Sequence, residues 1–305
     1  MVQYSSDEIP QLSGRRYLVT GANAGIGFAC AVQLCKQGAR VLLGCRDEGR
    51  GREAQRILQD RYGESSAQLV SLDLSDQQSV RRCAEMVESS PLHGLVNNAG
   101  IVRAGGQNSA GEFDLRFATN HLGHFALTGL LLGPLTRTGG RVVTVSSMTY
   151  RTIEPNWGLS RTGGIEFKGG YALSKLANLV FALELQRRAE RAELNLKSVA
   201  CHPGAVDTNM IANYVPRLYR IARPLIAWLL NSPSGGALPV LRAITDPDVQ
   251  GGEFFAPRGL MEWAGGATPV QVRGLHKKMN SAKALWDLSE QATGVNVLSE
   301  YQAFI

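Results

Sequence analysis

The chain has 305 residues, of which 44% are hydrophobic and 19% are charged, with a formal net charge of +6 at pH 7 and an isoelectric point near 9.2. These values are those of an ordinary soluble globular protein with enough residues for a substantial core. The basic residues are spread thinly, for example as Arg15/Arg16 and Arg81/Arg82, and form no stripe interleaved with aromatic residues. We therefore expect a solvated basic surface and no nucleic-acid partner.

Targeting signals and metal motifs are absent from the sequence. The start, MVQYSSDEIPQL, lacks the pattern of a signal peptide, and no run approaches the ~18 apolar residues of a membrane span, so we expect a cytoplasmic protein without an integral membrane segment. The five cysteines are scattered without a CxxC pair, which favours buried thiols. The histidines show no metal-ligand spacing, and the pair His121 and His124 is typical of packing or surface positions, so we predict no metal.

In chain order, short apolar runs alternate with segments of helical periodicity. The predicted strands are 15–20, 39–45, 67–72, 94–98, 141–147, 196–202 and 252–257. The predicted helices are 25–37, 49–62, 75–89, 111–137 and 171–193. This order predicts a single α/β domain of the Rossmann type, a doubly wound parallel sheet of about seven strands with helices on both faces. Two long interruptions, 148–170 and 205–251, are where such folds place their chemistry.

Three glycines follow the first predicted strand in the sequence TGANAGIG. Gly21, Gly25 and Gly27 have the spacing GxxxGxG and open the first long helix. Glycines allow the backbone to approach a pyrophosphate, whose charge the helix N-terminus favours. The pattern predicts a dinucleotide cofactor, and the alternative is a loop that only turns the chain.

The end of the second predicted strand indicates which nicotinamide cofactor is used. Cys45 stands where a carboxylate would bind the ribose 2'-hydroxyl, and Arg46 follows it. A guanidinium suits a 2'-phosphate, which favours NADP(H) over NAD(H), whereas Asp47 could instead select NAD, or Arg46 could be a surface residue. Asp73, after the third strand, either holds the adenine edge or caps the next helix.

Several polar residues further along the chain are candidates for catalysis. Tyr171 and Lys175 in YALSK lie four residues apart and share a helix face, where the ammonium would stabilise a phenolate. Ser146 and Ser147 end the fifth strand, where a hydroxyl could donate to a substrate carbonyl. Asn120 lies inside a predicted helix, where asparagine is energetically unfavourable. We therefore expect its side chain to have a specific partner.

Taken in order, TGANAGIG, the DL pair at 73–74, NNAG at 97–100, Asn120, VSS, YALSK and HPGAVDT at 202–208 resemble the short-chain dehydrogenase/reductase (SDR) family over roughly residues 14–260. NHLGHF and SKLAN further resemble the branch with retinol dehydrogenases, protochlorophyllide reductases and WW-domain oxidoreductases. The resemblance implies that 14–204 form the dinucleotide-binding and catalytic core, 205–265 the substrate-binding region and 266–305 a C-terminal helix and tail.

The resemblance also implies the role of each candidate. Tyr171 would be the general acid or base, Lys175 would lower its pKa and bind the nicotinamide ribose, Ser147 would orient the carbonyl, and Asn120 would hold a water in a proton relay. The implied cofactor-binding residues are Gly21, Asn23, Ala24, Gly25, Ile26, Gly27, Arg46, Asp73, Leu74, Asn98, Ala99, Gly100, Tyr171, Lys175, Pro203, Gly204, Val206 and Thr208.

One departure from the family pattern leaves open which serine is the catalytic one. Tyr171 follows Ser147 by 171 − 147 = 24 residues, about twice the usual interval, so that Ser160 is closer in sequence although Ser147 follows a strand. The insertion also leaves both a monomer and a homo-oligomer open.

Composition of the region 205–265 bears on the substrate. It is apolar and aromatic around Trp228, which predicts a lipophilic aldehyde, ketone or alcohol, unless these residues are simply core. The alternative function is a nucleotide-binding protein without catalysis that acts as a sensor or interaction partner.

Overall fold

A computed structural model describes residues 4–102, 112–161, 167–206 and 231–298. Its centre is an eight-stranded sheet in the order β3-β2-β1-β4-β5-β6-β7-β8, in which every neighbouring pair from β3 to β7 is parallel and β7 and β8 are antiparallel. The strands are β1 (Arg16–Thr20), β2 (Arg40–Cys45), β3 (Ala67–Ser71), β4 (Gly94–Asn97), β5 (Arg141–Val145), β6 (Lys197–Cys201), β7 (Phe254–Pro257) and β8 (Ala267–Pro269). This is the predicted doubly wound fold.

All seven predicted strands are present, and β8 is the strand that the sequence did not reveal. It has three residues, lies at the edge of the sheet and includes Pro269. A strand this short has no readable alternation, and proline is tolerated at an edge because it need not donate to a neighbouring strand.

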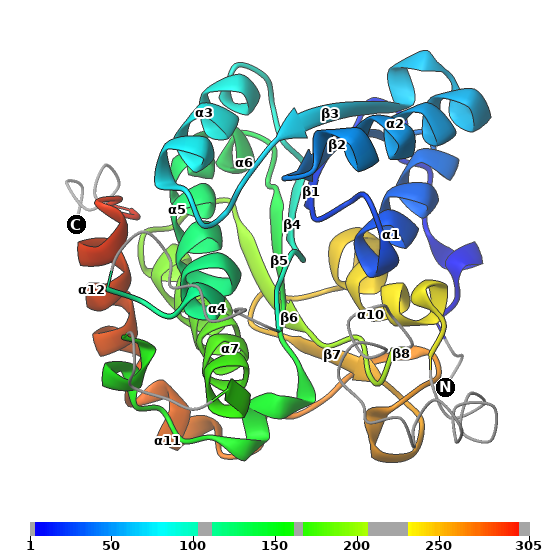
Figure 1. Cartoon of the computed structure of the whole chain (residues 1–305). Coiled ribbons are helices and arrows are strands. Elements are labelled where there is room, and N and C mark those ends of the chain that lie inside the picture. The colour runs from blue at the N-terminus through cyan, green and yellow to red at the C-terminus, as the bar shows by residue number, and fades with distance from the viewer. Residues whose placement is uncertain (1–3, 103–111, 162–166, 207–230, 299–305) are drawn as a thin grey trace.

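Helices cover both faces of the sheet (Figure 1). On one face the core contains side chains of α1 (Gly25–Lys36), α2 (Glu48–Tyr62) and α10 (Pro233–Thr245). On the other, side chains come from α3 (Gln77–Glu88), α5 (Gly123–Leu130), α6 (Leu132–Thr136), α7 (Phe167–Arg191) and α12 (Ala282–Thr293). The short helices are α4 (Leu115–Phe117), α11 (Leu275–Met279), and the tight turns η1 (Ser6–Glu8), η2 (Glu64–Ser66), η4 (Met148–Thr152), η5 (Trp157–Ser160) and η7 (Leu260–Glu262).

The segment 111–137 is not the single helix that its periodicity predicts. Within its described part, α4 is followed by a π-helical turn, η3 (Ala118–Leu122), and then by α5 and α6. Gly123 lies close to the loop that follows β3, and a Cβ on Gly123 would overlap the carbonyl oxygen of Leu74 in that loop. A π-helical turn inside a helix often marks a functional position, and here it contains Asn120.

Helix α10 was also missed, because it lies in the stretch 205–251 that the sequence analysis treated as an interruption. The sequence does contain a helix start signal there, a serine followed by a proline. In the structure the Ser232 hydroxyl accepts a hydrogen bond from the Gly235 N–H, and Pro233 is the first helical residue. By contrast, α7 begins at Phe167, four residues before the predicted start at Tyr171.

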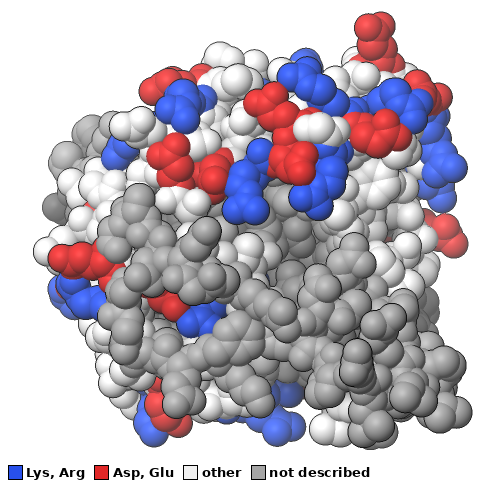
Figure 2. Space-filling view, in the orientation of Figure 1, with Lys and Arg blue, Asp and Glu red and all other residues white. Residues whose placement is uncertain are grey.

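All five cysteines are buried free thiols. Among the described helices none is long and apolar enough to cross a membrane, and the described residues contain no group of three His, Cys, Asp or Glu side chains that could hold a metal ion. On the face drawn in Figure 2, basic and acidic side chains are interspersed over α2 and α3.

Candidate active site

Most of the candidate residues lie at one edge of the sheet. Gly21, Arg46, Asp73, Asn98, Ser147 and Pro203 each follow, within two residues, the carboxyl end of one of the six parallel strands β1 to β6. The strand order reverses between β1 and β4, and the crevice at such a switch point is where doubly wound sheets bind nucleotides. The fold therefore gathers residues that lie more than 180 positions apart in the sequence.

The glycine loop packs closely against the end of β4. Gly21 and Gly25 have φ angles of 67° and 57°, which favour glycine, and a Cβ on Gly21 would lie 3.0 Å from the Cα of Ala99. A Cβ on Gly27 would overlap the carbonyl oxygen of Gly21 and lie 2.6 Å from the Asn98 amide nitrogen. These glycines are required by the protein's own packing as well as by any ligand.

We expect Gly27→Ala to lower the free energy of unfolding by about 1–3 kcal/mol, because the added methyl group must displace backbone. Gly133→Ala is the matched control, since a Cβ there has no atom within 4 Å and alanine is the better helix former. Thermal unfolding of both variants checks this. Equal stability of Gly27→Ala and the wild type would contradict the packing described.

Helix α1 is open at its N-terminus. Its N-cap residue, Ala24, provides no side-chain hydrogen bond, whereas Asp47, Asp76 and Ser232 cap α2, α3 and α10. The first N–H groups of a helix favour an anion, and a pyrophosphate would satisfy them. Ile26 lies near Val206 at this end, because a Cβ on Gly236 would contact both side chains. The loop thus fits the dinucleotide that the sequence predicts.

A buried thiol and an exposed guanidinium follow one another at the end of β2. Arg46 is exposed, whereas Cys45 is buried, with its sulfur near the backbone of Ala22 and Asn23. Burial raises the pKa of Cys45 to about 11, so this thiol is neutral at pH 7. Both carboxylate oxygens of Asp47 accept hydrogen bonds from Arg50. The Arg50 backbone nitrogen donates to Oδ1 at 3.0 Å, and the Arg50 Nε donates to Oδ2 at 2.7 Å.

Asp73 does not cap α3, so the capping alternative for this residue was wrong. Its Oδ1 accepts from the backbone nitrogen and the hydroxyl of Ser75, at 2.9 and 2.6 Å, whereas Asp76 caps the helix. Leu74 is buried below it. Asp73 is half-buried at the same edge, where the adenine-binding prediction places it.

Tyr171 and Lys175 share one face of α7, as predicted. The ammonium of Lys175 lies 5.8 Å from the centre of the Tyr171 ring and donates to the carbonyl oxygen of Val145 at 2.9 Å. Lys175 is only 4% exposed, and this burial lowers its pKa from 10.5 to about 8. Tyr171 is partly exposed. The geometry therefore holds a buried cation next to an accessible phenol.

The structure distinguishes the three serines. Ser146 is buried and donates to the Lys175 carbonyl oxygen at 2.7 Å, and Ser160 is buried and donates to the Trp157 carbonyl oxygen at 2.6 Å. Both hydroxyl hydrogens are thus used in local structure. Ser147 is half-buried, two residues beyond Val145, and its hydroxyl accepts from Thr149 N at 3.4 Å, which leaves its hydrogen for a ligand.

Asn120 has the specific partners that its unusual position predicts. Its side chain accepts from Ile101 N at 2.8 Å and donates to Ile101 O and to Ser174 Oγ, both at 2.9 Å. A Cβ on Gly100 would lie 3.3 Å from Asn120 Oδ1 and 3.5 Å from Lys175 Nζ. Asn120, Gly100 and Lys175 therefore meet beside the end of β4.

His124 links these parts and was not recognised in the sequence. Its Nδ1 lies 2.8 Å from the Asn120 carbonyl oxygen, which can only accept, so Nδ1 carries the proton and Nε2 accepts from the Thr20 hydroxyl at 2.9 Å. The Thr20 hydroxyl also accepts from the N–H groups of Asn98 and Ala99. Burial lowers the pKa of His124 to about 3, which keeps it neutral. Its spacing from Asn120, four residues on a helix, was the available signal.

The loop after β6 is held by a second network that the sequence did not reveal. Gly204, with a φ of 80°, directs its N–H to His202 Nδ1, so His202 donates from Nε2 to the Glu262 carboxylate at 2.7 Å. Arg151 from η4 donates to the same carboxylate oxygen at 2.5 Å. Glu262 itself has a left-handed φ of 61°. Gly204 is placed by this network, whereas Asn231 donates to the Pro203 carbonyl oxygen at 3.4 Å and forms a β-bridge with Val206. Thr208 and Trp228 lie outside the described residues.

Comparisons with known proteins agree with this geometry. A family model described as short chain dehydrogenase matches residues 15–218. Retinol dehydrogenase 14 of Mus musculus is 35% identical over 302 residues, covering 93% of this chain and 87% of the mouse protein. The crystal structure of an uncharacterized protein from Mycobacterium Paratuberculosis has a TM-score of 0.76 and 34% identity, covering 97% of this chain and 99% of that one. A Beutenbergia cavernae structure, described as an NAD(P) dependent gluconate 5-dehydrogenase with bound NADP, has a TM-score of 0.62 and 27% identity over 77% of this chain and 91% of that one.

The fold and these matches define an oxidoreductase of the Rossmann type that uses a nicotinamide dinucleotide. The chain belongs to the short-chain dehydrogenase/reductase family, in its retinol dehydrogenase-like branch. The chain is accordingly an oxidoreductase that interconverts carbonyl and alcohol groups on a small molecule.

Proposed function

We propose that the protein is an NADP(H)-dependent oxidoreductase that interconverts a lipophilic aldehyde or ketone and its alcohol. The observation that carries this proposal is the cluster of Tyr171, Lys175, Asn120 and Gly100 beside the open N-terminus of α1. In this proposal Tyr171 is the general acid or base, and the roles of Lys175, Ser147 and Asn120 are those that the family resemblance implies.

The side chains provide the proton-transfer half of the reaction. When bound, the nicotinamide would supply or accept the hydride at the substrate carbon. During reduction the Tyr171 hydroxyl would donate its proton to the carbonyl oxygen, and the Ser147 hydroxyl would donate a hydrogen bond to the same oxygen. Lys175, charged below its pKa of about 8, would stabilise the phenolate that results. Asn120, held by Ile101 and Ser174, would fix the water that returns the proton.

The end of β2 supports NADP(H) rather than NAD(H). A carboxylate at this position would accept from a ribose hydroxyl and would repel a 2'-phosphate, but Cys45 is a neutral thiol there. The exposed Arg46 can form a charge-assisted contact with the phosphate. The carboxylate oxygens of Asp47, which could otherwise select NAD, are already bonded to Arg50.

Arg46→Ala is expected to weaken NADPH binding about tenfold and to leave NADH binding nearly unchanged, because it removes one charge-assisted hydrogen bond to the 2'-phosphate. Titration with each cofactor, followed by quenching of the four tryptophans, checks this. Arg52→Ala is a control, since Arg52 is also exposed on α2 and is engaged with Glu48 rather than Asp47. Equal affinity of the wild type for NADH and NADPH would transfer the assignment to Asp47 and NAD.

A lipophilic substrate is supported by the composition of 205–265 and by the mouse relative, which is named for retinol, an apolar alcohol. Within the described part of this region, Met261 is 66% exposed beside the Glu262 network. A panel of apolar and charged carbonyl compounds, with turnover of NADPH as the readout, tests the substrate class. Turnover of charged compounds alone would exclude the proposal, and cofactor binding without turnover of any compound would favour the non-catalytic alternative.

A further inference from the structure

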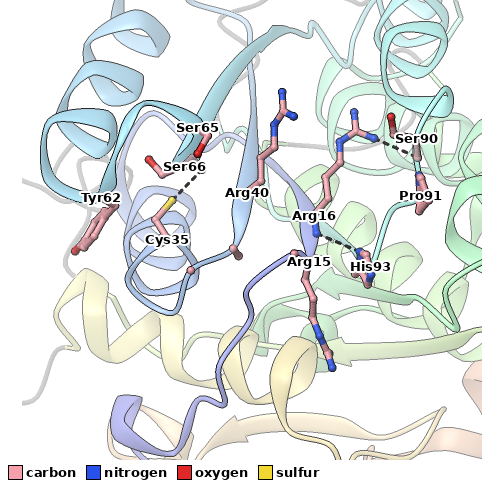
Figure 3. Close-up of a pocket in the computed structure, with 13 residues that line it drawn as sticks. Arg15, Arg16, Cys35, Arg40, Tyr62, Ser65, Ser66, Ser90, Pro91 and His93 are labelled. Atoms are coloured by element: carbon pink, nitrogen blue, oxygen red, sulfur yellow. Dashed lines mark hydrogen bonds between the residues drawn. The ribbon is translucent and has the colours of Figure 1, made fainter.

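A second pocket, of about 460 Å³, lies at the edge of the sheet opposite to the proposed active site. It is built around the first residues of β1 and β2, whereas the glycine loop and Arg46 follow the last ones. A five-residue strand spans roughly 16 Å, so the two sites are separate. Figure 3 shows its lining, which includes Arg16, Arg40, Tyr62, Ser65, Ser90 and His93.

Arg16 and Arg40 are directly paired in the register of the two parallel strands. Paired positions on neighbouring strands direct their side chains to the same face, and Figure 3 shows both guanidinium groups extending to the same side. Arg15, the preceding residue, extends the opposite way and is left out of the proposed contacts. Like charges placed directly opposite each other on a sheet destabilise it.

No carboxylate offsets this charge among the residues that the structure describes. Arg16 Nη1 donates to the carbonyl oxygens of Val87 and Ser90, at 2.8 and 3.1 Å, and Arg40 Nη2 donates to Gln68 Oε1 at 2.8 Å. These partners are neutral. By contrast, three exposed arginines of α2 pair with acids, in the ion pairs Arg50–Asp47, Arg52–Glu48 and Arg56–Glu53.

His93 adds a donor to the same pocket. Its Nδ1 accepts from the backbone nitrogen of Arg16 at 3.1 Å, so the proton of the neutral ring is on Nε2. Burial and then the charge of Arg15 lower the pKa of His93, and burial and then the charge of Arg40 lower the pKa of Arg16. A bound anion would relieve the repulsion between Arg16 and Arg40.

We propose that this pocket binds a phosphate group of a small phosphomonoester, with Arg16 and Arg40 as its cationic ligands and His93 as a further donor. Guanidinium groups match the geometry of phosphate oxygens. The volume exceeds that of a phosphate ion and leaves room for the organic part of the ligand. The same group occurs on soluble metabolites and on lipid headgroups.

Calorimetric titration of the whole protein with inorganic phosphate, with and without saturating NADPH, tests the proposal. We expect binding in both conditions, weakened about tenfold or more by Arg40→Gln. Arg137→Gln is the matched control, because it also removes one positive charge, and Arg137 donates to the Glu88 carbonyl oxygen without lining the pocket. Its phosphate affinity is expected to equal that of the wild type.

The proposal is overturned if the wild type binds no phosphate, if both variants lose affinity equally, or if NADPH displaces the phosphate and Arg46→Ala abolishes its binding. Flotation with phosphatidylcholine vesicles, with and without phosphatidic acid, separates the two sources. Capture by phosphatidic acid that Arg40→Gln removes assigns the phosphate to a lipid headgroup, and phosphate binding without capture assigns it to a soluble compound. Both results support the phosphate site.

Discussion

Tyr171→Phe is expected to lower turnover about 10²- to 10⁴-fold and to change cofactor affinity far less, because phenylalanine keeps the ring and removes only the hydroxyl that transfers the proton. The aromatic ring near the Lys175 ammonium is retained, so the local packing of α7 stays the same. The measurements are the turnover of an aldehyde with saturating NADPH and the tryptophan-quenching titration of the same samples.

Tyr150→Phe is the matched control for this variant. Tyr150 also carries a phenol near the end of β5, but it is fully buried and its hydroxyl accepts from Arg151 Nε at 3.3 Å, so it cannot reach a substrate. We expect it to keep turnover within a few-fold of the wild type. If Tyr171→Phe turned over its substrate as fast as Tyr150→Phe, another group would be the proton donor and the proposed mechanism would fail.

Sequence patterns located the strands and most candidate residues because these features depend on local order. A buried parallel strand is a short apolar run, and the side chains that follow such runs must meet at one edge of the sheet. The glycine loop and Ser147 could therefore be placed together without coordinates, whereas Tyr171 and Lys175 lie inside a helix and were joined to them by the family resemblance. The π-helical turn at Asn120 could not, because it depends on how closely Gly123 approaches the Leu74 carbonyl oxygen.

The supporting networks depend on contacts between distant segments and leave little trace in the sequence. His202 and Glu262 are 60 residues apart, and Thr20 and His124 are 104 apart. No periodicity links such pairs, and only the His124–Asn120 spacing could have been noticed. The paired arginines at the second pocket illustrate the same limit, since Arg16 and Arg40 become neighbours only through strand register.

Lys175→Met is expected to abolish most turnover and at the same time to stabilise the protein. Loss of the cation beside Tyr171 should reduce turnover about 10²-fold or more. Burial lowers the pKa of Lys175 from 10.5 to about 8, which corresponds to about 3 kcal/mol of destabilisation when the folded protein must keep the charge. Methionine fills a similar volume without charge, and Asn178 still donates to the Val145 carbonyl oxygen at 3.1 Å.

The pH dependence of stability shows whether Lys175→Met is more stable because it lacks the buried charge or because the core repacks. Between about pH 8 and pH 10.5 the unfolded lysine binds a proton that the folded one has lost, so the wild type's free energy of unfolding rises relative to that of the variant. The advantage of Lys175→Met should therefore be largest below pH 8 and vanish above about pH 10.5. Denaturant unfolding of the cofactor-free proteins across this range measures it. Lys197→Met is the control. Lys197 is the first residue of β6 and donates to the Val249 carbonyl oxygen, at the edge of the sheet away from the active site, so this variant should keep turnover. A constant difference between Lys175→Met and the wild type at all pH values would show that the buried charge is not its cause.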